Sequence, residues 1–207
     1  MKTWWVIAII AISILLLIVL TFLILKYIVH KQIKSYAQLA KEHVNITSRA
    51  IENLKDNNMV NFMNSISQYV DNSKQWFPKS REDSSQWVQL MKEHLQGVKD
   101  LGTAIINNDI NAQGPAILNL GQNQEKVVSF LQSRIKQNIK PELNRMWTDH
   151  LKCTVSYMKE IAANGKSDIY NNLVNSCANM AENMGAMLDK YALGKWSMSY
   201  RELLQEN

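Results

Sequence analysis

The sequence predicts an all-α protein in which an N-terminal transmembrane helix continues into an antiparallel up-down bundle of three helical hairpins, about six helices in all. Three observations lead to this prediction. Apolar residues recur at spacings of three and four rather than two, which is the period of amphipathic helices. The 207 residues include only seven Gly and three Pro, which disfavours disorder and an all-β fold. One motif also occurs three times with the same internal spacing, as in proteins built from repeated supersecondary units.

Each copy of this repeat contains an acid, a histidine and an aliphatic residue, followed by a turn about 14 residues later and an asparagine 29 residues after the histidine. The turn lies halfway between the histidine and the asparagine. In an antiparallel hairpin the two side chains are therefore at one height, where they can satisfy each other by hydrogen bonding. We expect three such ties that fix the register of the hairpins: His43 with Asn72, His94 with Asn123, and His150 with Asn179.

The first 29 residues form the predicted membrane anchor. Residues Trp4 to Leu25 are apolar except for Ser13 and Thr21, and about 22 residues in a helix span roughly 33 Å, enough for the hydrocarbon core of a bilayer. The apolar run is too long for a secretory signal peptide and is not followed by a small-residue cleavage site. We therefore expect a retained anchor.

The charges beside this anchor predict its orientation. Lys26, Lys31 and Lys34 follow the apolar run, whereas Lys2 alone precedes it. Positively charged flanks stay on the cytosolic side. The pattern thus places the remainder of a single-pass membrane protein on the cytosolic side.

No Gly or Pro interrupts residues 1–58, so one stiff helix is expected to run from the anchor to about Lys55. Pro is favoured in the first turn of a helix, which predicts helix starts near Gly114-Pro115 and at Pro141. After Gly194, Ser199 and Glu202 stand at capping-box spacing and could begin a short final helix. The other expected helices are Met59–Trp76, Ser84–Ile106, Pro141–Asn164 and Ser167–Leu193. The bundle then covers 30–193, with repeats at about 38–78, 84–135 and 140–192, and 194–207 form a tail.

The two cysteines also lie at one height across the third hairpin. Cys153 and Cys177 are three and 27 residues after His150. They are suited to packing, and a disulfide between them would require an oxidising compartment, which would argue against the cytosolic orientation. His150, Cys153 and Asn179 include the residue types of a cysteine-protease triad. Because the histidine and the asparagine recur in two copies that have no thiol, we expect no catalytic role for them.

Metal binding is the alternative interpretation of the three histidines, which could converge if the hairpins were arranged around an axis. Each neighbouring acid points about 100° away from its histidine on a helix, so each repeat offers one ligand. The Glu-x-x-His pattern of di-iron bundles occurs in none of the three repeats. The structural tie is the favoured interpretation, and no metal, cofactor or catalytic residue is predicted.

In copy three, Trp147, His150, Leu151 and Thr154 form the pattern Trp-x-x-His-Val/Leu-x-x-Thr. This pattern resembles that of a helical-hairpin family found in bacilli and in large DNA viruses, whose members later carry Asn-Gln or Asn-Ala. The likeness covers about residues 38–192 and departs from the family at Val98, where Thr is usual. The family has no established activity, so the resemblance implies a helical fold and a virion or viral-membrane role, without site residues. The matching residues are Trp147, His150, Leu151 and Thr154 in copy three, His43, Val44 and Thr47 in copy one, and Asn123-Gln124 with Val127-Val128 in copy two.

Together these features predict a non-enzymatic, membrane-anchored scaffold that tethers a bilayer to a protein layer, such as a minor capsid or inner-membrane component of a large DNA virus. Its partners would be the lipid bilayer, capsid or other structural proteins, and further copies of itself. The net charge of +5 is spread along the chain, which disfavours nucleic-acid binding. The candidate partner contact is the tail, with Trp196, Met198, Tyr200 and Leu204.

A single-pass membrane sensor with a ligand-binding helical bundle is the alternative function. Trp76, Trp87 and Trp147 could line its pocket.

Overall fold

The computed structural model describes residues 5, 12–24, 34–77 and 80–205, with side chains as far as Tyr191. The chain divides into two compact units, Met1–Lys34 and Ser35–Asn207. In the first unit, residues 12–24 are helical and their apolar side chains are exposed. Among the described residues, no helix combines the length and the hydropathy needed to cross a bilayer. Much of the predicted anchor, together with Lys2, Lys26 and Lys31, lies outside the described residues.

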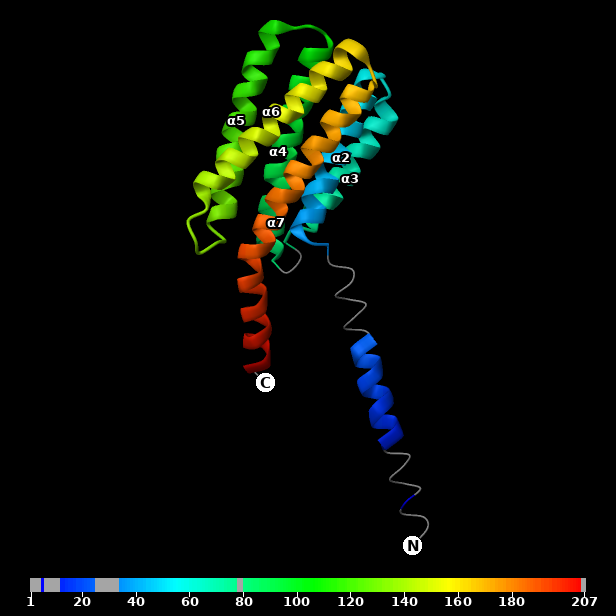
Figure 1. Ribbon diagram of the computed structural model, residues 1–207, viewed down its shortest axis with the longest axis vertical. Helices are drawn as coiled ribbons and strands as arrows, with labels where there is room; N and C mark the ends of the chain where they lie inside the picture. The colour runs from blue at the N-terminus through cyan, green and yellow to red at the C-terminus, as the bar shows by residue number, and fades with distance from the viewer. Residues whose placement is uncertain (1–4, 6–11, 25–33, 78–79, 206–207) are drawn as a thin grey trace. The chain divides into compact units, whose positions relative to one another are not determined.

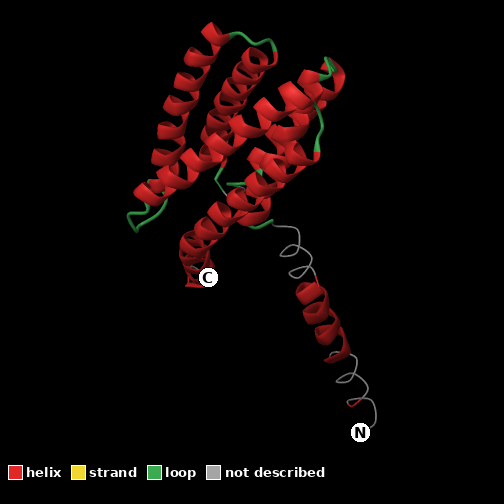
Figure 2. Cartoon of the chain, turned by 45° about the horizontal axis from the view of Figure 1, so that its top comes forward, coloured by secondary structure: helices red, strands yellow, loops and turns green. Residues whose placement is uncertain are grey.

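The second unit consists of six helices in the part of the chain that the structure describes. Every regular segment drawn there is helical (Figure 2), which confirms the all-α prediction. The helices are α2 (Tyr36–Lys55), α3 (Met59–Lys74), α4 (Arg81–Ile106), α5 (Ile110–Gln132), α6 (Lys140–Asn164) and α7 (Asp168–Gln205).

The helices pair into three hairpins, α2–α3, α4–α5 and α6–α7, as the repeat predicts (Figure 1). Each hairpin packs on the next, and α7 returns against α2, so the six helices form a closed ring. The first helices of the three hairpins, α2, α4 and α6, also contact one another. They enclose an axis around which the three copies of the repeat are arranged.

Each hairpin turns at the predicted place because one residue there adopts a left-handed backbone conformation. Asn57 and Asn108 have φ of 53° and 54°, and Gly165 has φ of 68°. Asn and Gly tolerate this region best, which is why they end helices. Asn58 caps α3 and Asp109 caps α5, since the side chain of each accepts the backbone N–H of the residue three positions later.

The expected continuous helix from the anchor to Lys55 is wrong, because the chain is capped at Ser35. Ser35 has an extended backbone, its hydroxyl accepts the Gln38 N–H, and the Gln38 side chain accepts the Ser35 N–H. This capping box satisfies N–H groups that would otherwise be unpaired at a helix start. Both oxygens of Asp189 accept the next two N–H groups, at 2.9 and 3.1 Å from Tyr36 and Ala37.

Three other predicted helix ends are also wrong. Helix α4 begins at Arg81, after the cap Ser80, rather than near Ser84. Helix α5 begins at Ile110, so Pro115 is in its interior and not in its first turn. Helix α7 continues through Gly194 to Gln205, because a single glycine costs a helix only about 1 kcal/mol. The side chains of Trp196, Met198, Tyr200 and Leu204 lie outside the described residues.

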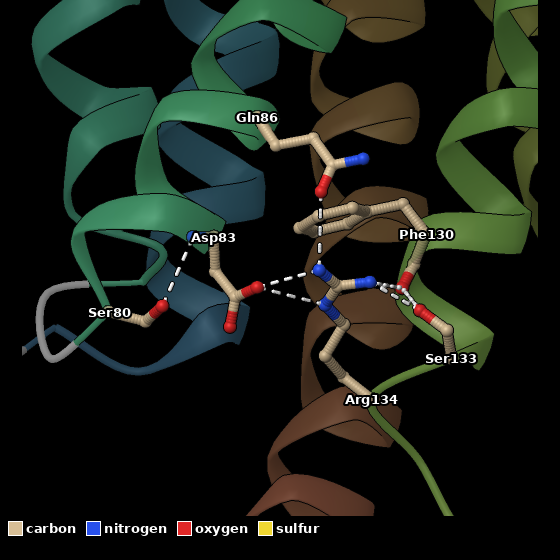
Figure 3. A network of polar contacts seen from close by, with 6 residues as sticks. All are labelled: Ser80, Asp83, Gln86, Phe130, Ser133 and Arg134. Atoms are coloured by element: carbon tan, nitrogen blue, oxygen red, sulfur yellow. Dashed lines mark hydrogen bonds and ion pairs between the residues drawn. The ribbon is translucent and has the colours of Figure 1, made fainter.

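The open end of the second hairpin is held by Arg134, which follows α5 (Figure 3). Its guanidinium donates to Asp83 in the first turn of α4, at 2.6 and 3.2 Å, and lies 3.8 Å from the centre of the Phe130 ring. It also donates to Gln86 and to Ser133. A half-buried arginine with several hydrogen bonds holds the start of α4 and the end of α5 in a fixed relative position.

The approach of α7 to α2 generates the first prediction. A Cβ at Gly185 would lie 2.3 Å from the Tyr36 carbonyl oxygen and 2.6 Å from the Ala37 Cα. Because these are backbone atoms, Gly185→Ala should force the helices apart and lower the free energy of unfolding by about 3 kcal/mol.

Gly121→Ala is the matched control, since a Cβ there meets no atom within 4 Å. It should raise the stability by up to about 1 kcal/mol. Urea unfolding followed by circular dichroism measures both variants. Equal stability of Gly185→Ala and the wild type would contradict the close packing of α2 and α7.

Candidate metal centre

Three histidines meet on the axis between α2, α4 and α6. His43, His94 and His150 occupy the same position in the three repeats, and each is buried, with 6%, 1% and 3% of its surface exposed. Their ring centres are 5.6, 5.8 and 6.2 Å apart. One nitrogen of each ring lies within 4.8 Å of a nitrogen of each of the others.

The inward face of each inner helix explains this placement. Residues three before and four after each histidine share its helix face, and they are buried as well. A continuous buried stripe therefore runs along α2, α4 and α6, and the histidine is the middle of each stripe. The flanking residues are Ala40, Met91 and Trp147 before the histidines, and Thr47, Val98 and Thr154 after them.

Four buried ring nitrogens of this group have no hydrogen-bonding partner in the described part of the chain. They are Nε2 of His43, both nitrogens of His94, and Nδ1 of His150. More than nine in ten buried polar groups in proteins are paired, and an unpaired one costs about 1–3 kcal/mol. The arrangement therefore requires an explanation beyond packing.

The predicted histidine–asparagine tie is wrong in the first hairpin, where the Asn72 side chain binds elsewhere. In the second hairpin Asn123 donates to the backbone and makes no well-aligned hydrogen bond to His94, but its carboxamide is close enough to raise the pKa of that ring. The Asn72 amide donates to the Leu39 carbonyl at 3.2 Å, and the Asn123 amide donates to the Leu90 carbonyl at 2.9 Å. Each leucine is four residues before its histidine, so the repeat does contain a hairpin tie, but to the backbone. Asn72 also accepts from the Trp76 indole at 3.4 Å.

The third predicted tie is wrong because Asn179 is exposed, while His150 is buried. The predicted alignment of the two arms of this hairpin is nevertheless confirmed. Cys153 and Cys177, which were predicted to lie at one height, form a disulfide with Cα atoms 5.7 Å apart. Helix α7 turns Cys177, Ala178 and Ala181 towards the core, and this rotation points Asn179 outwards. Spacing along a hairpin sets the height of a residue but not the direction of its side chain.

Burial keeps the three imidazoles neutral at physiological pH. Desolvation lowers the pKa of His94 to about 3 and that of His150 to about 4, and it lowers the pKa of His43 well below 6.5. The neighbouring histidines lower the pKa of His43 and His94 further, since two positive rings would repel each other. The Asn123 carboxamide opposes this effect at His94. Neutral imidazoles carry the free lone pair that a metal ion requires.

The geometry fits one metal ion after a small contraction. Three nitrogens bound to one tetrahedral metal lie about 3.4 Å apart, given metal–nitrogen distances of about 2.0–2.1 Å. The observed separations of up to 4.8 Å require each nitrogen to move inwards by no more than about 0.8 Å, which rotation of the rings can supply. Within the described residues, this group contains neither carboxylate nor thiol.

A small cavity adjoins two of the histidines. Its volume of about 10 Å³ is close to that of one water-sized sphere. The predicted pocket tryptophans, Trp76, Trp87 and Trp147, all line it. The rest of its wall consists of His43, His150, Ala40, Met91, Ala181 and Met184. The two methionines were not predicted as site residues, although Met91 could have been found from its position one turn before His94.

Comparisons with family models, with curated proteins and with solved structures find no match for this chain. The functional argument therefore rests on the arrangement of the chain's own residues.

The buried histidines predict that the metal-free protein is destabilised by mild acid. The pKa values of the buried histidines are lower in the folded state than the value of about 6.5 in an unfolded chain. At a pH between the folded and unfolded pKa values, the unfolded state therefore binds more protons than the folded state. Stability is therefore fully present above about pH 6.5 and falls as the pH is lowered. With three histidines, the loss should approach about 4 kcal/mol per pH unit below pH 6.

Urea unfolding of metal-free protein between pH 7.5 and 5 measures this slope. The variant His94→Leu should remove about one third of it, because one proton fewer is linked to unfolding. A stability that is flat over this range would contradict the burial of the three imidazoles.

Proposed function

We propose that the bundle is a metal-binding module in which His43, His94 and His150 hold one transition-metal ion on the axis of the three hairpins. The convergence of three buried, neutral imidazoles with unpaired nitrogens is the observation that carries this proposal. Imidazole is a preferred ligand of zinc, copper, iron and nickel.

A purely structural histidine cluster explains the observation less well. Without an occupant, four unpaired nitrogens would together cost several kcal/mol, a large fraction of the stability of an ordinary domain. Aliphatic side chains at the same three positions would fill the space without this loss. A metal ion would take one nitrogen of each ring as a ligand.

The ligand set also bears on the chemistry that the site can support. Three histidines leave a further position on the metal, as in catalytic zinc sites, whereas structural zinc sites use four protein ligands. The cavity beside His43 and His150 has room for about one water-sized molecule. The expectation of a non-enzymatic protein stays a prediction.

A membrane-anchored scaffold is the second candidate function, and it is compatible with metal binding. The exposed apolar side chains of residues 12–24 favour it, as does the resemblance to the repeat family of bacilli and large DNA viruses. The Cys153–Cys177 disulfide supports an oxidising compartment for the bundle, in opposition to the cytosolic side predicted from the lysines. Protease protection of the bundle in sealed membranes would distinguish the two orientations.

Metal content tests the main proposal. The purified full chain should bind about one transition-metal ion, and His94→Leu should weaken this binding by on the order of 100-fold or more, because it removes a ligand while it keeps the bulk of the side chain. Elemental analysis after dialysis, together with calorimetric titration, measures both effects.

Val98→Ala is the control, since it disturbs the core one turn from His94 and leaves every imidazole in place. It should retain the metal. Metal binding by His94→Leu as tight as that of the wild type, or no binding by the wild type, would overturn the proposal.

A further inference from the structure

Two methionines line the cavity together with two of the histidines. Met91 and Met184 are 2% and 4% exposed, and both line the cavity together with His43 and His150. Met91 lies one turn before His94 on α4, and Met184 comes from α7. The Tyr69 hydroxyl donates to the Met91 sulfur at 3.8 Å, and the Tyr69 ring lies 4.8 Å from the His43 ring. The Met91 thioether is thus held in place by Tyr69, a residue of the first hairpin.

We infer that the site is selective for monovalent copper, with a thioether of Met91 or Met184 as a ligand in addition to the three imidazoles. This inference rests on the proposed metal centre and adds the identity of the ion. Thioether and imidazole ligands together favour Cu(I), whereas carboxylate and water ligands favour harder ions.

The charge of the site favours a monovalent ion. In the described residues, the histidine group includes no carboxylate or thiolate that would balance a second positive charge. The energy of burying an ion rises with the square of its charge, so a monovalent ion pays about a quarter of the penalty of a divalent ion of the same size.

The geometry and the surroundings agree with this choice. Three rings from three helices around one axis give a trigonal set, whereas Cu(II) and Ni(II) prefer square-planar or tetragonal sets. The indole of Trp147 packs 5.8 and 5.9 Å from the rings of His94 and His150. Trp76 and Trp87 also line the cavity, with ring centres 4.7 Å apart. Indole faces attract cations, and they also keep water from the metal.

Competitive titration of the full chain in detergent micelles tests this inference. Metal-free protein is titrated with Cu(I) in the absence of oxygen against a chromophoric Cu(I) chelator, and separately with Zn(II). We expect Cu(I) to bind at least about 100-fold more tightly than Zn(II). The double variant Met91→Leu, Met184→Leu should weaken Cu(I) binding at least about tenfold and leave Zn(II) binding nearly unchanged, since leucine conserves the volume and removes the sulfur.

Met187→Leu is the matched control, because Met187 is on the same helix as Met184 and packs against the core but does not line the cavity. It should bind both ions like the wild type. Histidine-dependent binding of Zn(II) at least as tight as that of Cu(I) would overturn the copper assignment and leave the tri-histidine centre standing. Cu(I) binding that is unchanged in the double variant would overturn the thioether assignment. Failure of both ions to bind would overturn the metal centre itself.

Discussion

The packing of α2, α4 and α6 against one another is the constraint on which the rest of the structure depends. Each of these helices is the first arm of a hairpin, and each presents the same face of its repeat to the common axis. One histidine per repeat is enough to form a three-histidine group, because the three hairpins bring their equivalent histidines to the same axis. The second arms, α3, α5 and α7, complete the ring around this centre.

The contacts away from the axis hold the hairpins in the register that the centre needs. The asparagine amides bind the backbone one turn before two of the histidines, and the disulfide fixes the third hairpin three residues after His150. Asp189 holds the start of α2, and Arg134 joins the start of α4 to the end of α5. Most of these contacts are at least partly buried, so they hold the three histidines in position.

The sequence predicted the all-α hairpins and most of their turns, because helical period and turn residues are local signals. It also placed Cys153 and Cys177 at one height. The direction of the side chains could not be predicted in the same way, since rotation of a helix about its own axis depends on packing with all its neighbours. For this reason Asn179 was expected inside and is exposed, and the histidines were expected to face their own hairpins and instead face one another. Ser35 and Gln38 stand at capping-box spacing in the sequence and could have predicted the start of α2. The continuous helix was predicted instead because residues 1–58 contain no Gly or Pro.

The central claim is that one metal ion lies on the axis, at equal distance from the three imidazoles. X-ray absorption spectroscopy of the metal-loaded full chain tests it most directly, because the nearest shell of scatterers reports the ligands themselves. The account predicts three nitrogen scatterers at about 2.0 Å, with the outer-ring pattern that is typical of imidazole. A nearest shell made up of oxygen, without that imidazole pattern, would contradict it.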